Sequence, residues 1–301
     1  MIKLIIITIT QLLFFSCSKH IIKPQIEETN AKARTAFFEI HDISILPGEE
    51  ANIEIQLYNN NYLFPYLNPI YGENVEIYQN QKLITKTNNS STSKNKNVML
   101  PLLPQDDLQV YQVSLEPSSN YAATGEFIIN VMNKCHPAII VDIDHTIANI
   151  SSLEFIVKKY NKVPTFDQAV EKLKLLSLNY RIIYLTARND MLMQATRDWL
   201  NFLNFPKGPI YFWNYSKHPF SVEFYKKNIL KTLSQKFKNI IAGIGDQETD
   251  ILAYQSIGLR SYAFRNNSIN LQNVIHVNSW DDFYSDLNNY VKDPQTLCSS
   301  P

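Results

Sequence analysis

The stretch "IIVDIDHTI", residues 139–147, decides the fold prediction. Its first half is a continuous apolar run rich in β-branched residues, which is typical of a strand buried on both faces. The run ends in two aspartates, Asp142 and Asp144, followed at once by His145 and Thr146. In parallel sheets the functional residues lie at the carboxyl ends of the strands. The stretch therefore predicts a parallel strand with chemistry at its end, where Thr146 steadies the turn through a side-chain to backbone bond.

The sequence after residue 133 alternates strand-like and helix-like segments. The strand-like segments are "RIIYLTAR", "GPIYFW" and "NIIAGIGDQ". The helix-like segments are "FDQAVEKLKLLSLNY", "MQATRDWLNFLNF", "FYKKNILKTLSQKF" and "ETDILAYQSIG", the last stopped by Gly258. Such alternation predicts an α/β domain with a doubly wound parallel sheet over residues 134–290, followed by a tail at 291–301.

Residues 34–133 have a different pattern. Short stretches such as "ANIEIQLY", "LQVYQVSLE" and "GEFIINVM" alternate apolar and polar residues with a period of two. This alternation is typical of strands with one buried face. The region is predicted to be a small antiparallel β-sandwich, with an immunoglobulin-like form as one possibility. Nothing catalytic stands out within it.

The first line, "MIKLIIITITQLLFFSCSKH", has an early lysine, a short apolar run and a small residue before Cys17. The run is too short to span a bilayer comfortably, so residues 1–17 are predicted to be an export signal. The cysteine's position resembles the lipobox of bacterial lipoproteins, although Phe14 stands where that pattern prefers leucine. We expect a lipid anchor at Cys17, a polar tether at residues 18–33 and a place in the cell envelope, on the periplasmic or outer-membrane face. Simple secretion is the alternative.

Composition sets further bounds. The 301 residues are 45% hydrophobic, enough for about two ordinary domains. Lysine plus arginine equal aspartate plus glutamate at 28 each, so no overall charge attracts nucleic acid, and no nucleic-acid partner is expected. Cys135 and Cys298 would meet an oxidising compartment outside the cytoplasm, where they either pair or remain separate thiols. The oligomeric state is left open.

Four polar clusters follow predicted strands or occupy helices that can face strand ends. They are Asp142 with Asp144, Thr186 with Arg188, Lys226 with Lys227, and Asp246 with Asp250. Each alone has a structural explanation, because aspartate and threonine cap helices and lysines cover exposed faces. Together, in this order, they indicate one site at the carboxyl edge of the sheet.

The residue types in these clusters fit phosphoryl transfer. Asp142, Asp144 and Asp246 would supply the hard oxygen ligands that Mg²⁺ requires. Asp142 could attack phosphorus and form an aspartyl-phosphate, while Asp144 could act as general acid and base. Thr186 would bind a phosphate oxygen and a lysine would supply positive charge. Arg188 either contacts the phosphate or forms a structural salt bridge.

The motifs "DIDHT", "LTAR", a lysine and "GDQETD" resemble the four motifs of the haloacid dehalogenase superfamily of phosphatases. From about residue 138 to 264 the similarity is greatest to the lipin-type (LNS2) branch, which includes phosphatidate phosphatases and lipid-binding proteins. The resemblance implies Asp142 as nucleophile, Asp144 as general acid/base with its backbone carbonyl on the metal, and Thr186 for phosphate binding. It also implies Asp246 as a metal ligand, supported by Asp250.

The sequence departs from the branch at three points. Tyr225 replaces a phenylalanine, which leaves the register of the motif open. Lys226 is the first choice for the motif lysine because Leu230 follows four residues later, and Lys227 is the alternative. Asp246 follows glycine where the branch commonly has asparagine. His145 stands where the superfamily often has glycine.

Substrate size follows from the spacing of the motifs. The intervals between Asp144 and Thr186 and between Arg188 and Lys226 leave no room for a full cap domain. An open site favours a bulky phosphomonoester, with a membrane phospholipid such as phosphatidate first. The alternatives are small phosphomonoesters, as for an exported acid phosphatase, or a non-catalytic lipid-binding lipoprotein.

Overall fold

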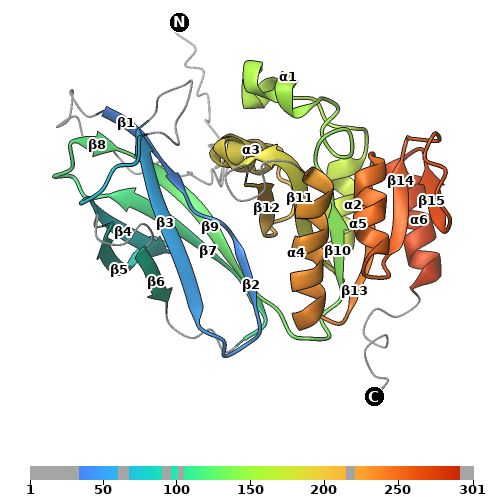
Figure 1. The fold of residues 1–301 in the computed structure, drawn as a ribbon, viewed down its shortest axis with the longest axis horizontal. Helices are drawn as coiled ribbons and strands as arrows, with labels where there is room; N and C mark the ends of the chain where they lie inside the picture. The colour runs from blue at the N-terminus through green and yellow to red at the C-terminus, as the bar shows by residue number, and fades with distance from the viewer. Residues whose placement is uncertain (1–33, 60–67, 90–95, 101–104, 215–220, 292–301) are drawn as a thin grey trace, which may run out of the picture. The chain divides into compact units, whose positions relative to one another are not determined.

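A computed structural model describes residues 34–59, 68–89, 96–100, 105–214 and 221–291, drawn in colour in Figure 1. These residues belong to one compact unit. The predicted signal and tether, with Cys17, and nearly all of the predicted tail lie outside the described residues. Within them, no helix is long and apolar enough to cross a membrane.

The first folded region is a sandwich of two sheets, with strands in the order β6-β3-β1-β8 and β2-β9-β7-β4-β5. The strands are β1 (Arg34–Glu39), β2 (Ile43–Ile45), β3 (Ala51–Asn59), β4 (Asn74–Gln79), β5 (Lys82–Asn88), β6 (Lys96–Leu100), β7 (Asp107–Leu115), β8 (Tyr121–Ala122) and β9 (Thr124–Val131). Apolar residues from both sheets, including Ile53, Ile77 and Phe127, form one buried core. The predicted sandwich is confirmed, and its immunoglobulin-like form stays a prediction.

The sandwich departs from pure antiparallel pairing where its first strand changes sheets. β1 pairs antiparallel with β3 in one sheet, whereas β2 runs parallel to β9 in the other. Residues 40–42 make the crossing between them. This crossing carries His41 and Asp42 toward the second folded region.

The second region is a six-stranded parallel sheet in the order β12-β11-β10-β13-β14-β15. Its strands are β10 (Ala138–Val141), β11 (Arg181–Asn189), β12 (Ile210–Trp213), β13 (Ile240–Gly245), β14 (Arg260–Phe264) and β15 (Val274–Val277). The predicted doubly wound α/β fold is confirmed. The first strand of this region, β10, lies in the middle of the sheet. The next two strands are added on one side of β10 and the last three on the other, so the switch point, where such folds place their sites, lies between β10 and β13.

Helices cover both faces of this sheet (Figure 1). They are α1 (Ser152–Val157), η3 (Tyr160–Lys162), α2 (Ala169–Leu176), η4 (Asp190–Leu192), α3 (Met193–Phe202), α4 (Val222–Lys236), α5 (Glu248–Gln255) and α6 (Trp280–Tyr290). Leu173, Trp199 and Phe283 bring α2, α3 and α6 into one core. Leu230 and Ile251 bring α4 and α5 into a separate core, which also contains Met132 from the end of the sandwich.

A buried carboxylate joins the two folded regions. Asp42 accepts hydrogen bonds from the backbone N–H of Ile128 in the sandwich, at 2.6 Å, and of Ile210 in the α/β region, at 2.7 Å. The Arg197 guanidinium completes the arrangement, 2.7 Å from Asp42 Oδ1. Asp42 and Arg197 are both buried. Charges this deep are tolerated when paired and hydrogen-bonded, so this contact fixes where the first strand meets β12 and α3.

A second contact between the regions centres on Asp106. Its carboxylate lies 2.7 Å from Arg181 Nη2 and 2.9 Å from His136 Nδ1, and it accepts the backbone N–H of Asn133. Cys135, beside this contact, is disulfide-bonded. Cys17 and Cys298 both lie outside the described residues, so the pairing of Cys135 with Cys298 stays a prediction.

The Asp42→Asn variant is expected to lose about 3 kcal/mol of unfolding free energy, because it leaves the Arg197 charge buried without a counter-charge. Urea denaturation at pH 7 followed by tryptophan fluorescence measures the loss. Adding Arg197→Met should restore part of it. Glu126→Gln removes an exposed pair with Lys207 and is the matched control, expected to change stability by less than about 0.5 kcal/mol. Equal losses in Asp42→Asn and Glu126→Gln would contradict the role of Asp42.

Candidate active site

The predicted site residues gather at the carboxyl ends of β10, β11 and β13. Asp142 directly follows β10, and its backbone N–H donates to the Ile244 carbonyl of β13 at 3.0 Å. Thr186 lies near the end of β11, and Asp246 follows β13. The sheet order makes β11, β10 and β13 neighbours, so residues distant in sequence come together at one edge.

Lys226 occupies the centre of the cluster. Its ammonium lies 2.7 Å from Asp142 Oδ1 and also donates to Asp250. All three residues are buried. Lys227 points elsewhere and pairs with Glu223 one helical turn earlier, at the surface. Of the two candidate lysines, the structure therefore brings Lys226 into the site.

Close packing of α5 against β13 brings Asp250 into the cluster. A side chain at Gly243 would overlap the ring of Tyr254, and one at Gly245 would overlap the carboxylate of Asp250. Asp250 also accepts the backbone N–H of Gln247 at 3.1 Å, which caps the helix. The two glycines of "AGIGD" therefore allow α5 to pack closely on β13, and Asp250 of α5 forms an ion pair with Lys226.

The cluster holds more negative than positive charge. Carboxylate oxygens of Asp142, Asp246 and Asp250 lie within 4.8 Å of one another. Burial raises the pKa of Asp142 well above its usual range, although Lys226 opposes the rise. Burial likewise raises the pKa of Asp246 to about 6. Three converging carboxylates beside one ammonium fit a hard divalent cation, because such an ion supplies the missing positive charge. The Asp144 carboxylate is not a member of this group.

Arg188 and Asp144 form a pair beside the cluster. Arg188 donates to the Asp144 carboxylate through Nε at 3.1 Å and Nη2 at 2.9 Å, and through Nη1 to Thr196. The guanidinium is fully buried, 3.9 Å from the centre of the Phe155 ring of α1. This arrangement favours the structural salt bridge over contact with a substrate phosphate. Arg188 would orient Asp144, and its backbone N–H donates to Thr186 Oγ1 at 3.1 Å.

The loop after β10 holds Asp142 from the other side. Thr146 Oγ1 donates to Asp142 Oδ2 at 3.3 Å. The predicted side-chain to backbone bond of Thr146 is therefore wrong, because its hydroxyl reaches the carboxylate instead. His145 is exposed and has a φ of 53°, in the left-handed region that favours glycine. The backbone thus explains why glycine suits this position, and histidine occupies it at a cost in strain.

Two further residues of the site lacked a signal in the sequence. Trp280, at the start of α6, donates from Nε1 to the backbone carbonyl of Thr146 at 3.2 Å. Asn266 donates from Nδ2 to the carbonyl of Asp246 at 2.7 Å. Both follow the late strands β14 and β15, which the sequence patterns did not reveal. They hold the backbone of the site from the side of the last two strands.

Residues 139–264 match the family model described as "PITM 1-3, LNS2 domain". The match contains Asp142, Lys226 and Asp250 and covers less than half of the chain. This region is similar to an LNS2 domain, hence the term LNS2-like domain. The match agrees with the resemblance of the sequence motifs to the lipin-type (LNS2) branch. Among curated proteins, none matches the chain.

Several solved structures resemble the chain at low identity. The D,D-heptose 1,7-bisphosphate phosphatase of B. bronchiseptica, complexed with magnesium and phosphate, is 11% identical, with a TM-score of 0.40, over 52% of this chain and 99% of its own. The cobalt-bound deoxy-D-mannose-octulosonate 8-phosphate phosphatase of Haemophilus influenzae is 13% identical, with a TM-score of 0.36, over 55% and 95%. A haloacid dehalogenase-like hydrolase of Streptococcus pneumoniae is 15% identical, with a TM-score of 0.38, over 51% and 99%. These likenesses assign no role to a residue of the LNS2-like domain.

Replacing the central lysine tests the charge balance of the LNS2-like domain. In metal-free buffer at pH 7, Lys226→Met should lose about 3 kcal/mol of unfolding free energy, because Asp142 and Asp250 lose their buried counter-charge. The deficit should shrink as the pH falls toward 5. Burial raises the pKa of Asp142 and Lys226 opposes the rise. Without Lys226, Asp142 of the folded variant takes up its proton at a higher pH than in the parent, so lowering the pH stabilises the variant more than the parent.

Lys227→Met is the matched control, since its partner lies at the surface. Its unfolding free energy should change by less than about 0.5 kcal/mol at either pH. Chemical denaturation at pH 5 and pH 7 measures both variants. A Lys226→Met deficit that is small, or that does not depend on pH, would contradict the assignment.

Proposed function

We propose that the protein is a Mg²⁺-dependent phosphatase in which Asp142 is the nucleophile, and that its substrate is a phospholipid of the phosphatidate type at a membrane surface. The main support for phosphatase activity is a buried group of charged residues at the switch point of the sheet, namely Asp142, Lys226, Asp246 and Asp250. Neither a helix cap nor a surface ion pair explains this group, because its charges are buried and unbalanced without a cation.

The residues divide the reaction between them. A carboxylate oxygen of Asp142 attacks phosphorus, and the bond from phosphorus to the leaving oxygen breaks as the aspartyl-phosphate forms. Asp144 gives its proton to the leaving oxygen, then takes one from the water that hydrolyses the intermediate. Thr186 and Lys226 face the phosphate oxygens and stabilise their charge. Mg²⁺, held by Asp142, Asp246 and the backbone carbonyl of Asp144 with support from Asp250, would screen the repulsion between carboxylate and phosphate.

An open site supports a bulky substrate. The described residues between Asp144 and Thr186 form α1, η3 and α2, and those between Arg188 and Lys226 form η4, α3, β12 and the start of α4. Neither interval contains a folded cap domain in its described part. A phosphate on a large headgroup could therefore approach the site without being enclosed.

The segment 152–162, which contains α1 and η3 and is called the flap, supports a membrane substrate. The helix α1 exposes Leu153, Ile156 and Val157, with 76%, 60% and 82% of their surfaces accessible. Three exposed lysines follow on the same segment, at positions 158, 159 and 162. Apolar side chains flanked by lysines are typical of segments that insert into the headgroup region of an anionic bilayer. The resemblance of the sequence motifs to the lipin-type branch, which includes phosphatidate phosphatases, supports this substrate class.

The anchor predicted from the sequence belongs to the same proposal. A lipid on Cys17 would hold the protein at a membrane in the bacterial cell envelope, outside the cytoplasm, with its site near lipid headgroups. Lipidation is testable by metabolic labelling with a fatty acid analogue, with Cys17→Ser as the control.

The activity is tested on the full-length protein with phosphatidate in mixed micelles and Mg²⁺. Release of phosphate is expected, and Asp142→Asn should abolish it because an amide cannot act as the nucleophile. Removing Mg²⁺ with a chelator should also stop the reaction. Equal or faster turnover of p-nitrophenyl phosphate would favour the small-substrate phosphatase over the lipid enzyme.

A non-catalytic lipid-binding protein is the alternative from another class, and it predicts a different result. A phosphatase of this kind should trap beryllofluoride at Asp142 in the presence of Mg²⁺, since the adduct mimics the aspartyl-phosphate. Mass spectrometry under native conditions would detect the adduct. Absence of trapping at every pH, together with binding of phosphatidate vesicles, would overturn the enzymatic proposal.

The flap is tested by replacing its three exposed apolar residues, Leu153, Ile156 and Val157, with serine. Turnover of micellar phosphatidate should fall at least tenfold, because the segment loses its apolar contact with lipid, while turnover of p-nitrophenyl phosphate stays within about twofold. Leu178→Ser is the control, since Leu178 is 78% exposed but lies outside the flap. If both substrates lose turnover equally, the flap acts on the site itself rather than on the membrane.

A further inference from the structure

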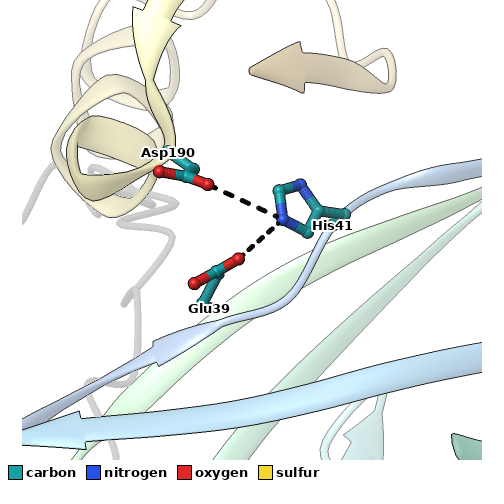
Figure 2. A group of neighbouring side chains, drawn as sticks. All are labelled: Glu39, His41 and Asp190. Atoms are coloured by element: carbon teal, nitrogen blue, oxygen red, sulfur yellow. Dashed lines mark hydrogen bonds and ion pairs between the residues drawn. The ribbon is translucent and has the colours of Figure 1, made fainter. Parts of the chain in front are cut away.

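Figure 2 shows a second group of potential metal ligands, which shares no residue with the proposed active site. Glu39 ends β1 and His41 lies in the crossing between β1 and β2, while Asp190 follows β11 at the start of η4. His41 Nε2 lies 2.9 Å from Glu39 Oε1 and 4.0 Å from Asp190 Oδ2. One ligand atom from each residue lies within 4.8 Å of the others.

The surroundings make this group unusual for a simple ion pair. Glu39 and Asp190 are both buried, and His41 is half-buried. Burial and the nearby Glu39 charge raise the pKa of Asp190 to about 7. Asn214 Nδ2 approaches Glu39 Oε1 at 3.4 Å. Two buried carboxylates thus approach one imidazole, and these are side chains that divalent transition metals bind.

We propose that Glu39, His41 and Asp190 bind a divalent transition-metal ion of the zinc type. Ligand atoms about 2.0–2.2 Å from a tetrahedral ion lie about 3.4 Å from one another. The two distances from His41 Nε2 bracket that value, so shifts of about half an ångström would bring these two pairs of atoms to the spacing of zinc ligands. The imidazole distinguishes this site from the all-oxygen group around Asp142, because imidazole favours zinc-like ions and carboxylates alone favour Mg²⁺.

The ligands are held in place by contacts that do not involve the metal. Asp42, next to His41, is fixed by Arg197 and by the backbone N–H groups of Ile128 and Ile210. Arg188, two residues before Asp190, is fixed by Asp144. Because the donors come from both folded regions, the ion would stabilise their junction. The inference does not depend on the proposed phosphatase activity.

The test uses the full-length protein carrying Asp246→Asn, which weakens the other candidate metal site. Isothermal titration calorimetry of the metal-free protein with Zn²⁺ should show binding at one site. His41→Ala or Asp190→Asn should weaken it at least tenfold. His136→Ala is the matched control, because His136 also pairs with a carboxylate, Asp106, but belongs to no group of three ligands among the described residues. This control should bind Zn²⁺ like its parent.

A gain-of-signal variant keeps the test decisive if the first two variants fold poorly. His41→Cys replaces the imidazole with a thiolate, so Co²⁺ should produce a sulfur-to-cobalt charge-transfer band that the parent protein lacks. His136→Cys should give no such band. Absence of Zn²⁺ binding to the Asp246→Asn protein, an equal loss in His136→Ala, or no cobalt band in a folded His41→Cys protein would overturn the proposal.

Discussion

The Lys226 ammonium lies buried between the carboxylates of Asp142 and Asp250, and charges in such a place are stable only while they stay together. This requirement fixes two helices at once, since α4 carries Lys226 and α5 carries Asp250. It also explains Gly243 and Gly245, which allow α5 to approach β13 closely. A third carboxylate, Asp246, leaves the group short of positive charge, and that deficit is the physical basis for expecting a cation.

The order of the strands turns four separate sequence clusters into one site. Because the chain begins in the middle of the sheet and reverses between β10 and β13, the ends of these strands flank the switch point. Every residue of the cluster therefore comes from a strand end or from the first two turns of a helix. Replacing one side chain would change the charge of the site without altering the sheet, whose stability comes from apolar residues such as Ile140 and Leu185.

Local patterns in the sequence predict the sheet, most of the helices and the aspartates at the strand ends, because these depend on periodicity and on neighbouring residues. The spacing to Leu230 favours Lys226 over Lys227 but does not decide between them. Packing of the helix on the sheet decides which of the two lysines is buried. Local patterns do not reveal that Arg188 forms a salt bridge with Asp144. That pair joins residues far apart in sequence, and either partner could as well have faced solvent or substrate.

Strand β11 links three features of the molecule. Near its end, Thr186 lies in the proposed active site, Arg188 holds Asp144, and Asp190 follows in the second ligand group. On the flap side, Phe155 of α1 packs against the Arg188 guanidinium, while the opposite side of the same helix is exposed and apolar. A membrane that contacts α1 and a metal ion that binds Asp190 would therefore act on the same short segment. Arg188 offers a physical route from both to Asp144, because Arg188 contacts α1 and Asp144 and lies two residues from Asp190.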